Sequence, residues 1–473
     1  MQNSPTERLF AILERQRSAF AEEMNPTVAV RQDRLARLAA MSEKHAARII
    51  EAISADFGHR SAHETQMAEL LVLSGSIRHA QRHLKRWMKP RRVPTAMQYR
   101  PASNRLLRQP LGVVGIVAPW NYPYQLALEP ALAALAAGNR VMIKPSELTP
   151  RLSELLQRIV AEHFDEAEMA VVTGDAQTGK AFSELPFDHL LFTGSTAVGR
   201  MVAQAAAKNL TPVTLELGGK SPAILDPSSD LAVVAPRLAF GKLLNAGQTC
   251  IAPDYAFVPK DRVDAFVEHM QRAVTKMYPR LDANPDYSSI VSDKHFARLQ
   301  GLLEDARAKG ARIVTINPAG ETFDPARRKQ PPALVLGATP EMKLMQEEIF
   351  GPILPVLGYE RIEDAIAYIN RHDRPLALFW FGSDGANRDK VLNQTISGAV
   401  SINDCNWHFA QEYQPFGGVG ASGNGCYHGE WGFRTFSKEK PVFIQPRLNG
   451  TFLLYPPFGR TFERMLALLR RIV

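Results

Sequence analysis

The chain has 473 residues, of which 45% are hydrophobic and 22% charged, and its formal net charge is +8. This length is more than one small hydrophobic core requires, so we expect two or three domains of a globular protein. Its three cysteines exclude a secreted disulfide framework and favour a reducing, cytoplasmic location. We expect neither a signal peptide at the N-terminus nor an apolar stretch long enough to span a bilayer.

The first part of the chain predicts helices followed by a basic arm. Residues 5–88 carry apolar side chains at helical spacing, and Pro90 and Pro94 end the pattern. Residues 78–108 hold ten lysines and arginines and no acidic residue. They lack the interleaved aromatic residues of a nucleic-acid site, so a solvated helix face and an arm explain them better. We expect 91–108 to lie outside the main core, with extended backbone around 97–99.

From residue 112 onward, strands and helices alternate. Short apolar runs predict buried strands at 112–117, 140–144, 169–173 and 188–193. Ala- and Leu-rich segments between and after them predict helices at 125–137, 151–163 and 197–208. This order is typical of an α/β fold with a parallel sheet, in which ligands bind at the carboxyl ends of the strands.

A second α/β unit is expected after residue 212. Its predicted strands lie at 255–258, 312–316 and 353–357, with a further apolar run at 376–381. Its predicted helices lie at 261–277, 292–309 and 362–370. Residues 317–332 predict a polar loop, and 403–441 form a segment rich in Gly and aromatic residues.

Cys250 is the first candidate for chemistry. It lies among small residues at 245–253, which leaves room for a substrate carbon to reach the sulfur. A thiol is a strong nucleophile once its proton is removed, whereas most free cysteines are small buried hydrophobes. Asn121, Lys144, Glu216 and Glu348 follow strand ends marked by Gly or Pro, and each alone is explained equally well as turn or surface chemistry.

The joint pattern is more specific than any one residue. Pro-Trp-Asn-Tyr-Pro at 119–123 and Gly-Gln-Thr-Cys at 247–250 belong to an ordered series of motifs. The others lie at 144–147, 192–196, 215–220, 348–352 and 415–418. Together they resemble the aldehyde dehydrogenase superfamily. Residues 248–255 and 427–429 resemble its subgroup of class 3, fatty and coniferyl aldehyde dehydrogenases. The resemblance implies two α/β domains with parallel sheets and a small β oligomerisation arm.

The resemblance also implies roles for three residues in the NAD(P)-dependent oxidation of an aldehyde to a carboxylic acid. Cys250 would attack the aldehyde to give a thiohemiacetal, and hydride loss would leave a thioester. The Asn121 side-chain amide and the Cys250 backbone N–H would stabilise the oxyanion. Glu216 would act as the base that activates water. This base argues against the branch of the family that transfers the acyl group to coenzyme A.

A second set of residues is expected to bind the cofactor. The resemblance places Lys144 and Glu147 at the adenosine ribose. Gly194, Ser195 and Gly199 would face the pyrophosphate at a helix N-terminus. Glu147 would favour NAD by repelling a 2′-phosphate, whereas Lys144 leaves NADP open. The remaining expected contacts lie toward the nicotinamide end: Glu348 at its ribose, Phe350 against its ring, and Trp120 and Leu217 nearby.

The implied organisation has an NAD(P)-binding domain at 1–88 and 108–214 and a catalytic domain at 215–400. An arm at 89–107 and 401–445 would join two copies in a homodimer, and 446–473 would form a tail. In the tail, Phe462, Met465, Leu466, Leu469 and Ile472 share a helical face. For this face, packing on a protein surface or fraying is favoured over contact with an anionic membrane. No nucleic-acid partner is expected.

Two other functions are open to a chain with these residues. A cofactor-independent cysteine ester hydrolase and a non-catalytic aldehyde- or cofactor-binding scaffold are the alternatives. Residues 174–180 match most of a phosphate-binding P-loop, but Ala181 stands where a Ser or Thr must contact magnesium. His408 is expected to line a pocket or support structure rather than act as a base. The histidines and cysteines show no metal-ligand spacing, so no metal site is expected.

The pocket walls cannot be placed from the sequence. Tyr122, Trp407, His408 and Phe409 are candidate lining residues. Their aromatic character favours a medium-chain aliphatic or an aromatic aldehyde, and coniferyl aldehyde is one candidate.

Overall fold

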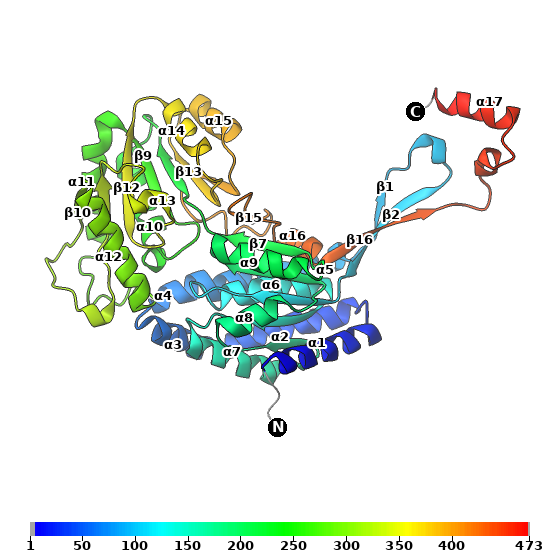
Figure 1. The fold of residues 1–473 in the computed structure, drawn as a ribbon, viewed down its shortest axis with the longest axis horizontal. Coiled ribbons are helices and arrows are strands. Elements are labelled where there is room, and N and C mark those ends of the chain that lie inside the picture. Colours follow the sequence, from blue (N-terminus) through cyan, green and yellow to red (C-terminus); the bar gives the residue numbers. More distant parts are fainter. Residues whose placement is uncertain (1–4, 472–473) are drawn as a thin grey trace.

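The computed structural model describes residues 5–471, which form three β-sheets flanked by helices (Figure 1). The chain begins with helices, as predicted for residues 5–88. They are α1 (Pro5–Glu22), α2 (Val28–Lys44), α3 (Ala46–Phe57), α4 (Ala62–Thr65), the π-helical turn η1 (Gln66–Leu71) and α5 (Val72–Trp87). The apolar faces of α2 and α3 are fully buried at Leu35, Leu38, Ile49 and Ile53.

The first α/β unit contains a six-stranded sheet in the order β15-β7-β6-β3-β4-β5. Its five parallel strands are β3 (Val113–Val117), β4 (Arg140–Lys144), β5 (Met169–Val171), β6 (His189–Gly194) and β7 (Val213–Leu217). The short β15 (Gly423–Asn424) pairs antiparallel with β7. The helices after these strands are α6 (Gln125–Ala137), α7 (Pro150–His163), α8 (Ala176–Ser183) and α9 (Thr196–Ala207).

One strand differs from the sequence prediction. The segment after residue 212 was expected to begin the second unit, but β7 pairs in parallel with β6 and belongs to the first sheet. The change from one sheet to the other therefore comes after Leu217. The Gly218-Gly219 turn follows at once, and a turn of this kind suits a chain that leaves one sheet for another.

The second unit contains a seven-stranded sheet in the order β10-β11-β12-β9-β8-β13-β14. Its strands are β8 (Pro222–Leu225), β9 (Tyr255–Pro259), β10 (Arg312–Thr315), β11 (Ala333–Leu336), β12 (Ile353–Tyr359), β13 (Ala377–Phe381) and β14 (Ala399–Ile402). Only the edge strand β10 runs antiparallel to its neighbour. The predictions lacked β8, β11 and β14, which have four residues each; apolar runs this short are weak signals, although the equally short β10 was predicted.

Helices cover this second sheet. They are α10 (Leu231–Leu243), α11 (Val263–Met277), α12 (Asp293–Ala308), α13 (Lys343–Gln346), α14 (Ile362–Asn370) and α15 (Gly385–Gln394). Short 3-10 turns lie at η3 (Leu244–Gly247), η4 (Lys260–Arg262) and η5 (Pro325–Arg327). The predicted helices at 261–277, 292–309 and 362–370 match α11, α12 and α14 closely. The helices α10, α13 and α15 were not predicted.

A third, three-stranded antiparallel sheet projects from the body of the molecule (Figure 1). It consists of β1 (Arg91–Val93), β2 (Ser103–Pro110) and β16 (Ser437–Ile444), with β2 in the centre. The helix α16 (Gly429–Thr435) leads into β16. The hairpin outside the core was therefore predicted correctly. The extended backbone expected at 97–99 was wrong, because Met97–Tyr99 forms a short 3-10 helix, η2.

The tail follows the arm and lies at its far end (Figure 1). It contains the 3-10 turn η6 (Thr451–Leu454) and α17 (Arg460–Leu469), and none of the side chains of α17 is buried. Ile472, predicted to extend its apolar face, lies outside the described residues, as do the first four residues of the chain. Within residues 5–471, no helix combines the length and the apolar character needed to cross a membrane.

Candidate active site

The candidate residues of the first sheet gather at one edge. Asn121 follows β3, Lys144 ends β4, Gly194 ends β6, and Glu216 and Leu217 end β7. Because β3, β4, β6 and β7 are parallel, their carboxyl ends share the same edge of the sheet. Strand β3 pairs with both β4 and β6, so the helices that follow β3 and β6 start where the strand order reverses. Such a reversal is where open α/β sheets bind ligands.

Cys250 lies on a tightly constrained loop between α10 and β9. Asn245 and Ala246 have left-handed backbone, with φ of 53° and 52°. At Gly247, with φ of 77°, an added Cβ would lie 2.4 Å from the carbonyl oxygen of Gly351, so a larger residue does not fit. The buried Gln248 side chain donates to the carbonyl oxygens of Asn245 at 2.9 Å and Ser289 at 3.0 Å. The thiol is thus carried on a loop with little freedom.

Three hydrogen bonds join the loop after β3 to the Cys250 loop, one of them from Asn245 Nδ2 to the Asn121 carbonyl oxygen at 3.0 Å. Asn121 Nδ2 donates to the Gln248 carbonyl oxygen at 3.2 Å, across 127 residues of sequence. The Tyr122 hydroxyl lies 2.7 Å from Thr249 Oγ1. The Asn121 amide is therefore held beside the residues that immediately precede the thiol.

The thiol and two carboxyl groups share a buried environment. Burial raises the pKa of Cys250 to about 12, and the carboxylates of Glu348 and Glu216 add to that rise. Burial also raises the pKa of Glu216 well above its ordinary value, and neither carboxyl oxygen has a hydrogen-bond partner. The free protein therefore favours a neutral thiol and a neutral acid, so a proton must leave the thiol before it can attack a carbonyl carbon.

Glu348 approaches the same region from the segment before β12. An added Cβ at Gly218 would lie 1.9 Å from Glu348 Oε2, so glycine is required for the carboxyl group to come this close to the end of β7. Burial raises the pKa of Glu348 to about 8, and the nearby Asp254 adds to the rise. The buried Lys242 amine has no hydrogen-bond partner, and burial lowers its pKa to about 8.

The remaining candidates fit a dinucleotide in their chemistry. Ser195 caps the N-terminus of α9, where backbone N–H groups and the helix dipole favour a pyrophosphate. An added Cβ at Gly199 would lie 2.6 Å from Leu217 Cδ2, so α9 packs directly on the end of β7. Lys144 Nζ donates to Glu147 Oε2 at 2.9 Å and forms a separate charged pair at the end of β4.

The nicotinamide end of this expected arrangement is aromatic. The Trp120 ring contacts the Phe350 ring edge-on at a centroid distance of 5.3 Å. The structure therefore brings Asn121, Glu216, Cys250 and Glu348 into one region and places Trp120 and Phe350 together. Lys144 and Glu147 contact each other instead.

Sequence reasoning missed several buried polar residues around this region. Arg60 lies in the loop between α3 and α4, Glu64 in α4 and Glu69 in η1, and each is at most 8% exposed. In the sequence they occupy a helical pattern in which charged residues ordinarily face solvent. No local signal distinguishes them from solvated residues, because their partners lie far away in the sequence.

His408 has a structural environment, as expected. Its Nδ1 atom lies 2.8 Å from Ser401 Oγ, and its ring stacks on Phe416. Burial lowers the pKa of His408 to about 4, so the ring is neutral at physiological pH.

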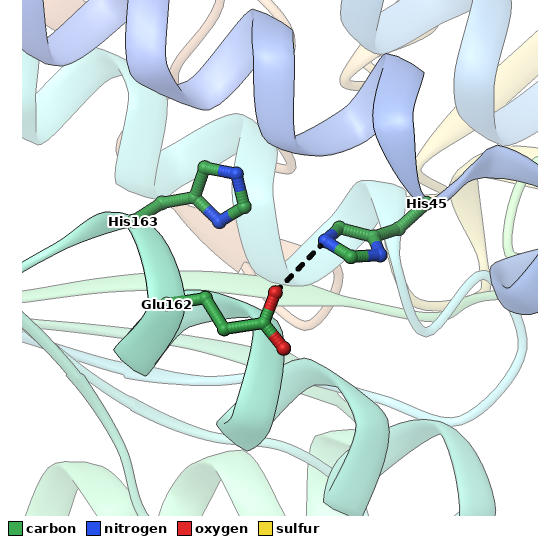
Figure 2. A group of neighbouring side chains, drawn as sticks. All are labelled: His45, Glu162 and His163. Carbon is green, nitrogen blue, oxygen red and sulfur yellow. Dashed lines mark ion pairs between the residues drawn. The ribbon is translucent and has the colours of Figure 1, made fainter.

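A cluster at the surface of α7 brings together three side chains with metal-ligand chemistry, His45, Glu162 and His163 (Figure 2). Their candidate ligand atoms lie within 4.8 Å of one another. Arg48 lies 3.3 Å from His45 Nδ1, and a guanidinium can only donate, so the His45 proton resides on Nε2. That nitrogen faces Glu162 Oε2 at 3.3 Å. This contact is an ion-pair contact and not a hydrogen bond, and His163 Nδ1 lies 2.8 Å from the Ile159 carbonyl oxygen, so both histidines already have contacts within the chain.

Comparisons with known proteins agree with this geometry. Residues 1–442 match the model of the aldehyde dehydrogenase family. A Pseudomonas aeruginosa protein named "Probable coniferyl aldehyde dehydrogenase" is 50% identical, over 97% of this chain and 95% of its own length. The "Coniferyl aldehyde dehydrogenase" of a Pseudomonas species is 46% identical, over 98% and 96% of the two chains. A substrate-bound structure of Staphylococcus aureus AldH, 37% identical, superposes with a TM-score of 0.92 and covers 98% of this chain and 99% of that chain.

Proposed function

Because this chain belongs to the aldehyde dehydrogenase family, whose members oxidise aldehydes to carboxylic acids with NAD or NADP, we propose that Cys250, Asn121 and Glu216 perform that reaction. The observation that carries the proposal is the hydrogen bond from Asn121 Nδ2 to the Gln248 carbonyl oxygen at 3.2 Å. It holds an amide donor beside the loop that carries Cys250, the cysteine of the family motif Gly-Gln-Thr-Cys.

The first step is attack of the Cys250 sulfur on the carbonyl carbon. The thiol proton leaves to a base, for which Glu216 is the candidate, and the C–S bond forms as the carbonyl π electrons move to oxygen. The resulting oxyanion accepts hydrogen bonds from the second Asn121 N–H and from the Cys250 backbone N–H. Donors fixed before the reaction stabilise such an oxyanion by about 3 kcal/mol each.

The cofactor is held by the second group of residues. Lys144 and Glu147 would bind the adenosine ribose, Gly194, Ser195 and Gly199 the pyrophosphate, and Glu348 the nicotinamide ribose. Leu217, Trp120 and Phe350 would supply apolar walls. When bound, the oxidised nicotinamide accepts the hydride that the thiohemiacetal loses. We propose NAD over NADP, because the Glu147 carboxylate repels a 2′-phosphate.

The thioester is then hydrolysed with Glu216 as the base. Glu216 first releases the thiol proton to solvent. Its Oε1 or Oε2 then takes a proton from water, the water oxygen attacks the thioester carbon, and the C–S bond breaks to release the acid and the thiolate. A buried carboxyl group without hydrogen-bond donors holds its proton strongly. Burial accordingly raises the pKa of Glu216. The same affinity makes its ionised form an effective proton acceptor.

For the substrate, we propose a medium-chain aliphatic or an aromatic aldehyde such as coniferyl aldehyde. Two relatives that are 46–50% identical carry coniferyl aldehyde in their names. Phe409 and Cys250 pack against the same hydrophobic cluster, and the Phe409 ring lies 4.8 Å from the rings of Phe416 and His428. Aromatic walls of this kind favour a flat, apolar substrate.

The cellular setting follows from the same premise. We propose a cytoplasmic homodimer in which the arm at 89–107 and 401–445 contacts a second copy. We keep the NAD(P)-binding domain at 1–88 and 108–214 and the catalytic domain at 215–400 as part of this proposal. The first sheet, however, extends to Leu217. The tail is proposed to pack against protein rather than membrane.

The test measures reduced nicotinamide by absorbance, with NAD or NADP and with acetaldehyde, hexanal, benzaldehyde and coniferyl aldehyde. Cys250→Ala is expected to abolish the signal, and Cys426→Ala, which removes another partly buried free cysteine, is expected to retain it. Turnover that persists in Cys250→Ala would refute the nucleophile. Faster turnover of acetaldehyde than of the larger aldehydes would refute the substrate class. Hydrolysis of an activated ester without any cofactor reduction would favour an ester hydrolase.

A further inference from the structure

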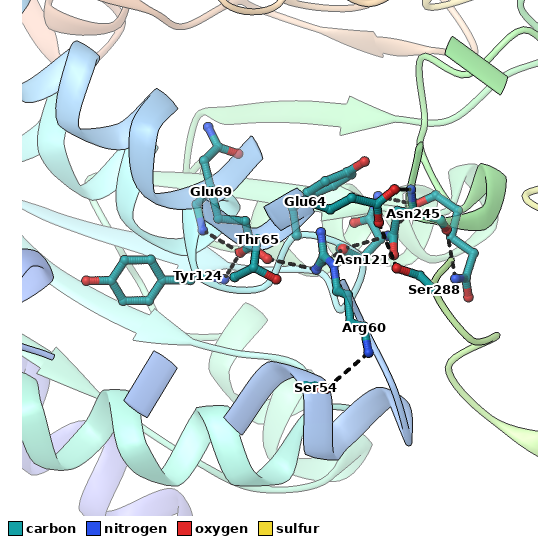
Figure 3. Close-up of polar contacts among 12 residues, drawn as sticks. Ser54, Arg60, Glu64, Thr65, Glu69, Asn121, Tyr124, Asn245 and Ser288 are labelled. Atoms are coloured by element: carbon teal, nitrogen blue, oxygen red, sulfur yellow. Dashed lines mark hydrogen bonds and ion pairs between the residues drawn. The ribbon is translucent and has the colours of Figure 1, made fainter. Parts of the chain in front are cut away.

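A buried charged network connects the N-terminal helices to both loops of the candidate site (Figure 3). Arg60 lies between α3 and α4 and is 1% exposed. Its Nη1 atom donates to Glu69 Oε1 at 2.7 Å and to the backbone carbonyl oxygen of Asn121 at 3.0 Å. The guanidinium also lies over the rings of Phe57 and Tyr122, at 5.2 Å and 4.8 Å from their centroids. Arg60 thus contacts the Asn121 loop both through a hydrogen bond and through the flat face of its guanidinium.

Glu69 connects this ion pair to the helix that follows the Asn121 loop. Its Oε2 atom accepts from the backbone N–H groups of Tyr124 at 2.8 Å and Gln125 at 3.1 Å. These groups lie at the N-terminus of α6, which has no other side-chain cap. A carboxylate here satisfies orphan donors and complements the helix dipole. The loop between β3 and α6 is therefore anchored at Asn121 and again at Tyr124.

Glu64 performs the corresponding task for the Cys250 loop. Its Oε1 atom accepts from the backbone N–H of Asn245 at 3.1 Å, and its Oε2 atom accepts from Ser288 Oγ at 2.7 Å. Asn245 Nδ2 in turn donates to the Asn121 carbonyl oxygen at 3.0 Å and to the Gln248 carbonyl oxygen at 3.2 Å. The Asn121 carbonyl oxygen is therefore shared by Arg60 and Asn245, so one atom couples the two loops.

We propose that Arg60 and Glu64 are positioning residues for the oxyanion donors of this enzyme, an inference that rests on the proposed function of Asn121 and Cys250. Arg60 fixes the backbone of Asn121, and Glu64 fixes the strained turn that begins the Cys250 loop. Together they set the relative position of the Asn121 amide and the Cys250 backbone N–H. Neither residue contacts the reacting atoms; both act through the loops that carry them.

The strained turn explains why such support is needed. Asn245 and Ala246 both hold left-handed backbone, which costs free energy in a residue other than glycine. The hydrogen bond from the Asn245 N–H to Glu64 opposes relaxation of that turn. A displacement of about 1 Å between reacting groups lowers a rate by on the order of 10²-fold. Removal of either support should therefore affect the chemical step more than cofactor binding.

The test compares Arg60→Met, Arg60→Lys and Glu64→Gln with the wild-type protein. Arg34→Met is the matched control, because Arg34 is equally buried and pairs with Glu168 at 3.0 Å, outside both loops. Pre-steady-state reduction of NAD is measured with saturating aldehyde, and the KM for NAD is measured in parallel. Hydrogen exchange is followed in peptides covering 119–124 and 244–251, which needs no activity. All rates are referred to the folded fraction of each variant.

We expect Arg60→Met and Glu64→Gln to lower the burst rate by about tenfold to 10²-fold while the KM for NAD stays within about twofold. Exchange should be faster in both peptides for Arg60→Met and in 244–251 for Glu64→Gln. Arg60→Lys should recover part of the rate because it keeps the charge. Arg34→Met should change neither the burst rate nor the exchange of these peptides.

Three results would overturn the inference. One is a burst rate in Arg60→Met and Glu64→Gln equal to that of Arg34→Met. Another is a raised KM for NAD in these variants with an unchanged burst rate. The third is unchanged exchange at 119–124 and 244–251. Failure of the proposed function is distinguishable, because it would appear as the lack of a burst in the wild-type protein, whereas the exchange experiment still decides whether Arg60 and Glu64 hold the two loops.

Discussion

Two buried carboxyl groups, Glu69 and Glu216, are 0% and 3% exposed but have opposite surroundings. Glu69 accepts from Arg60 and from two backbone N–H groups, whereas neither oxygen of Glu216 has a hydrogen-bond partner. Burial raises the pKa of both, and only at Glu69 do a positive charge and hydrogen-bond donors oppose that rise. The comparison shows that the buried carboxyl group that supports the site, Glu69, has hydrogen-bond donors around it. The proposed base, Glu216, has none and is free to exchange a proton.

The largest expected effect comes from the unpartnered member of the comparison. Glu216→Gln should lower steady-state turnover by on the order of 10²- to 10⁴-fold, because an amide cannot take a proton from water. The acyl-enzyme should accumulate, so one equivalent of NADH forms and turnover then stalls; this first equivalent should form more slowly than in the wild-type protein, because Glu216 is also the candidate base for the thiol. Rapid-mixing absorbance measures both phases. Steady turnover at the wild-type rate would remove Glu216 as the base of thioester hydrolysis.

The pH dependence of the same step follows from the raised pKa of Glu216. A base acts when ionised, so hydrolysis should speed up as the pH rises through that pKa. The sign for stability is the reverse: the folded state holds a proton that the unfolded chain has released, so stability falls as the pH rises from the ordinary carboxyl range toward the raised value. Glu216→Gln should lose the alkaline rise in rate, and a rise that persists would assign it to another group.

The next largest effect concerns the side-chain amide of Asn121, whose backbone is held by Arg60. Asn121→Ala should lower the burst rate by on the order of 10²- to 10³-fold, because one oxyanion donor is lost. The KM for NAD should change little, since Asn121 is not among the proposed cofactor contacts. The measurement is pre-steady-state reduction of NAD with the same aldehyde as above. A loss no larger than that of Arg34→Met would exclude Asn121 as an oxyanion donor.

Glu69→Gln probes the partnered carboxylate itself. It should lower the free energy of unfolding by about 3 kcal/mol, because it leaves the buried Arg60 charge without its partner. Denaturant unfolding measures this loss. Glu360→Gln is the control, because Glu360 also pairs with a cation, Lys260, at 2.9 Å but with its side chain 70% exposed. The control should leave stability unchanged within error, and an equal loss in the two variants would refute the distinction between buried and exposed pairs.

The smallest expected effect concerns the negative charge of Glu348 and the pKa of Cys250. Glu348→Gln should lower the pKa of Cys250, because a neighbouring negative charge that disfavours the thiolate is removed. Alkylation by iodoacetamide at a fixed pH above about 8, where Glu348 is ionised, should become faster, by less than about tenfold. Glu347→Gln, whose carboxylate is half exposed and pairs with Arg298, is the control and should leave the rate unchanged. Slower alkylation in Glu348→Gln would contradict the charge assignment.

The sequence alone determined the order of the strands that carry the candidate residues. Apolar runs bounded by Gly and Pro are local signals, so 112–117 and 140–144 could be predicted as strands, the first followed by Asn121 and the second ending at Lys144. The motif around Cys250 is local as well, and the family that it indicates agrees with the match over residues 1–442. The segment after residue 212 was assigned to the second unit, but β7 belongs to the first sheet; its pairing with β6 is a contact between separate segments, which no local signal reveals.

Only the tertiary structure decided which polar groups have partners. Glu64 meets Asn245 across 181 residues and Ser288 across 224, and Arg60 meets the Asn121 carbonyl oxygen across 61. The family motif singles out Glu216, but it does not say which of Glu64, Glu69 and Glu216 has hydrogen-bond partners, since motifs and periodicity each describe one element at a time. Whether a carboxyl group is buried with three donors or with none depends on what the packed elements place around it. That difference, between the supports of the site and its proposed base, arises when the N-terminal helices pack against the two loops.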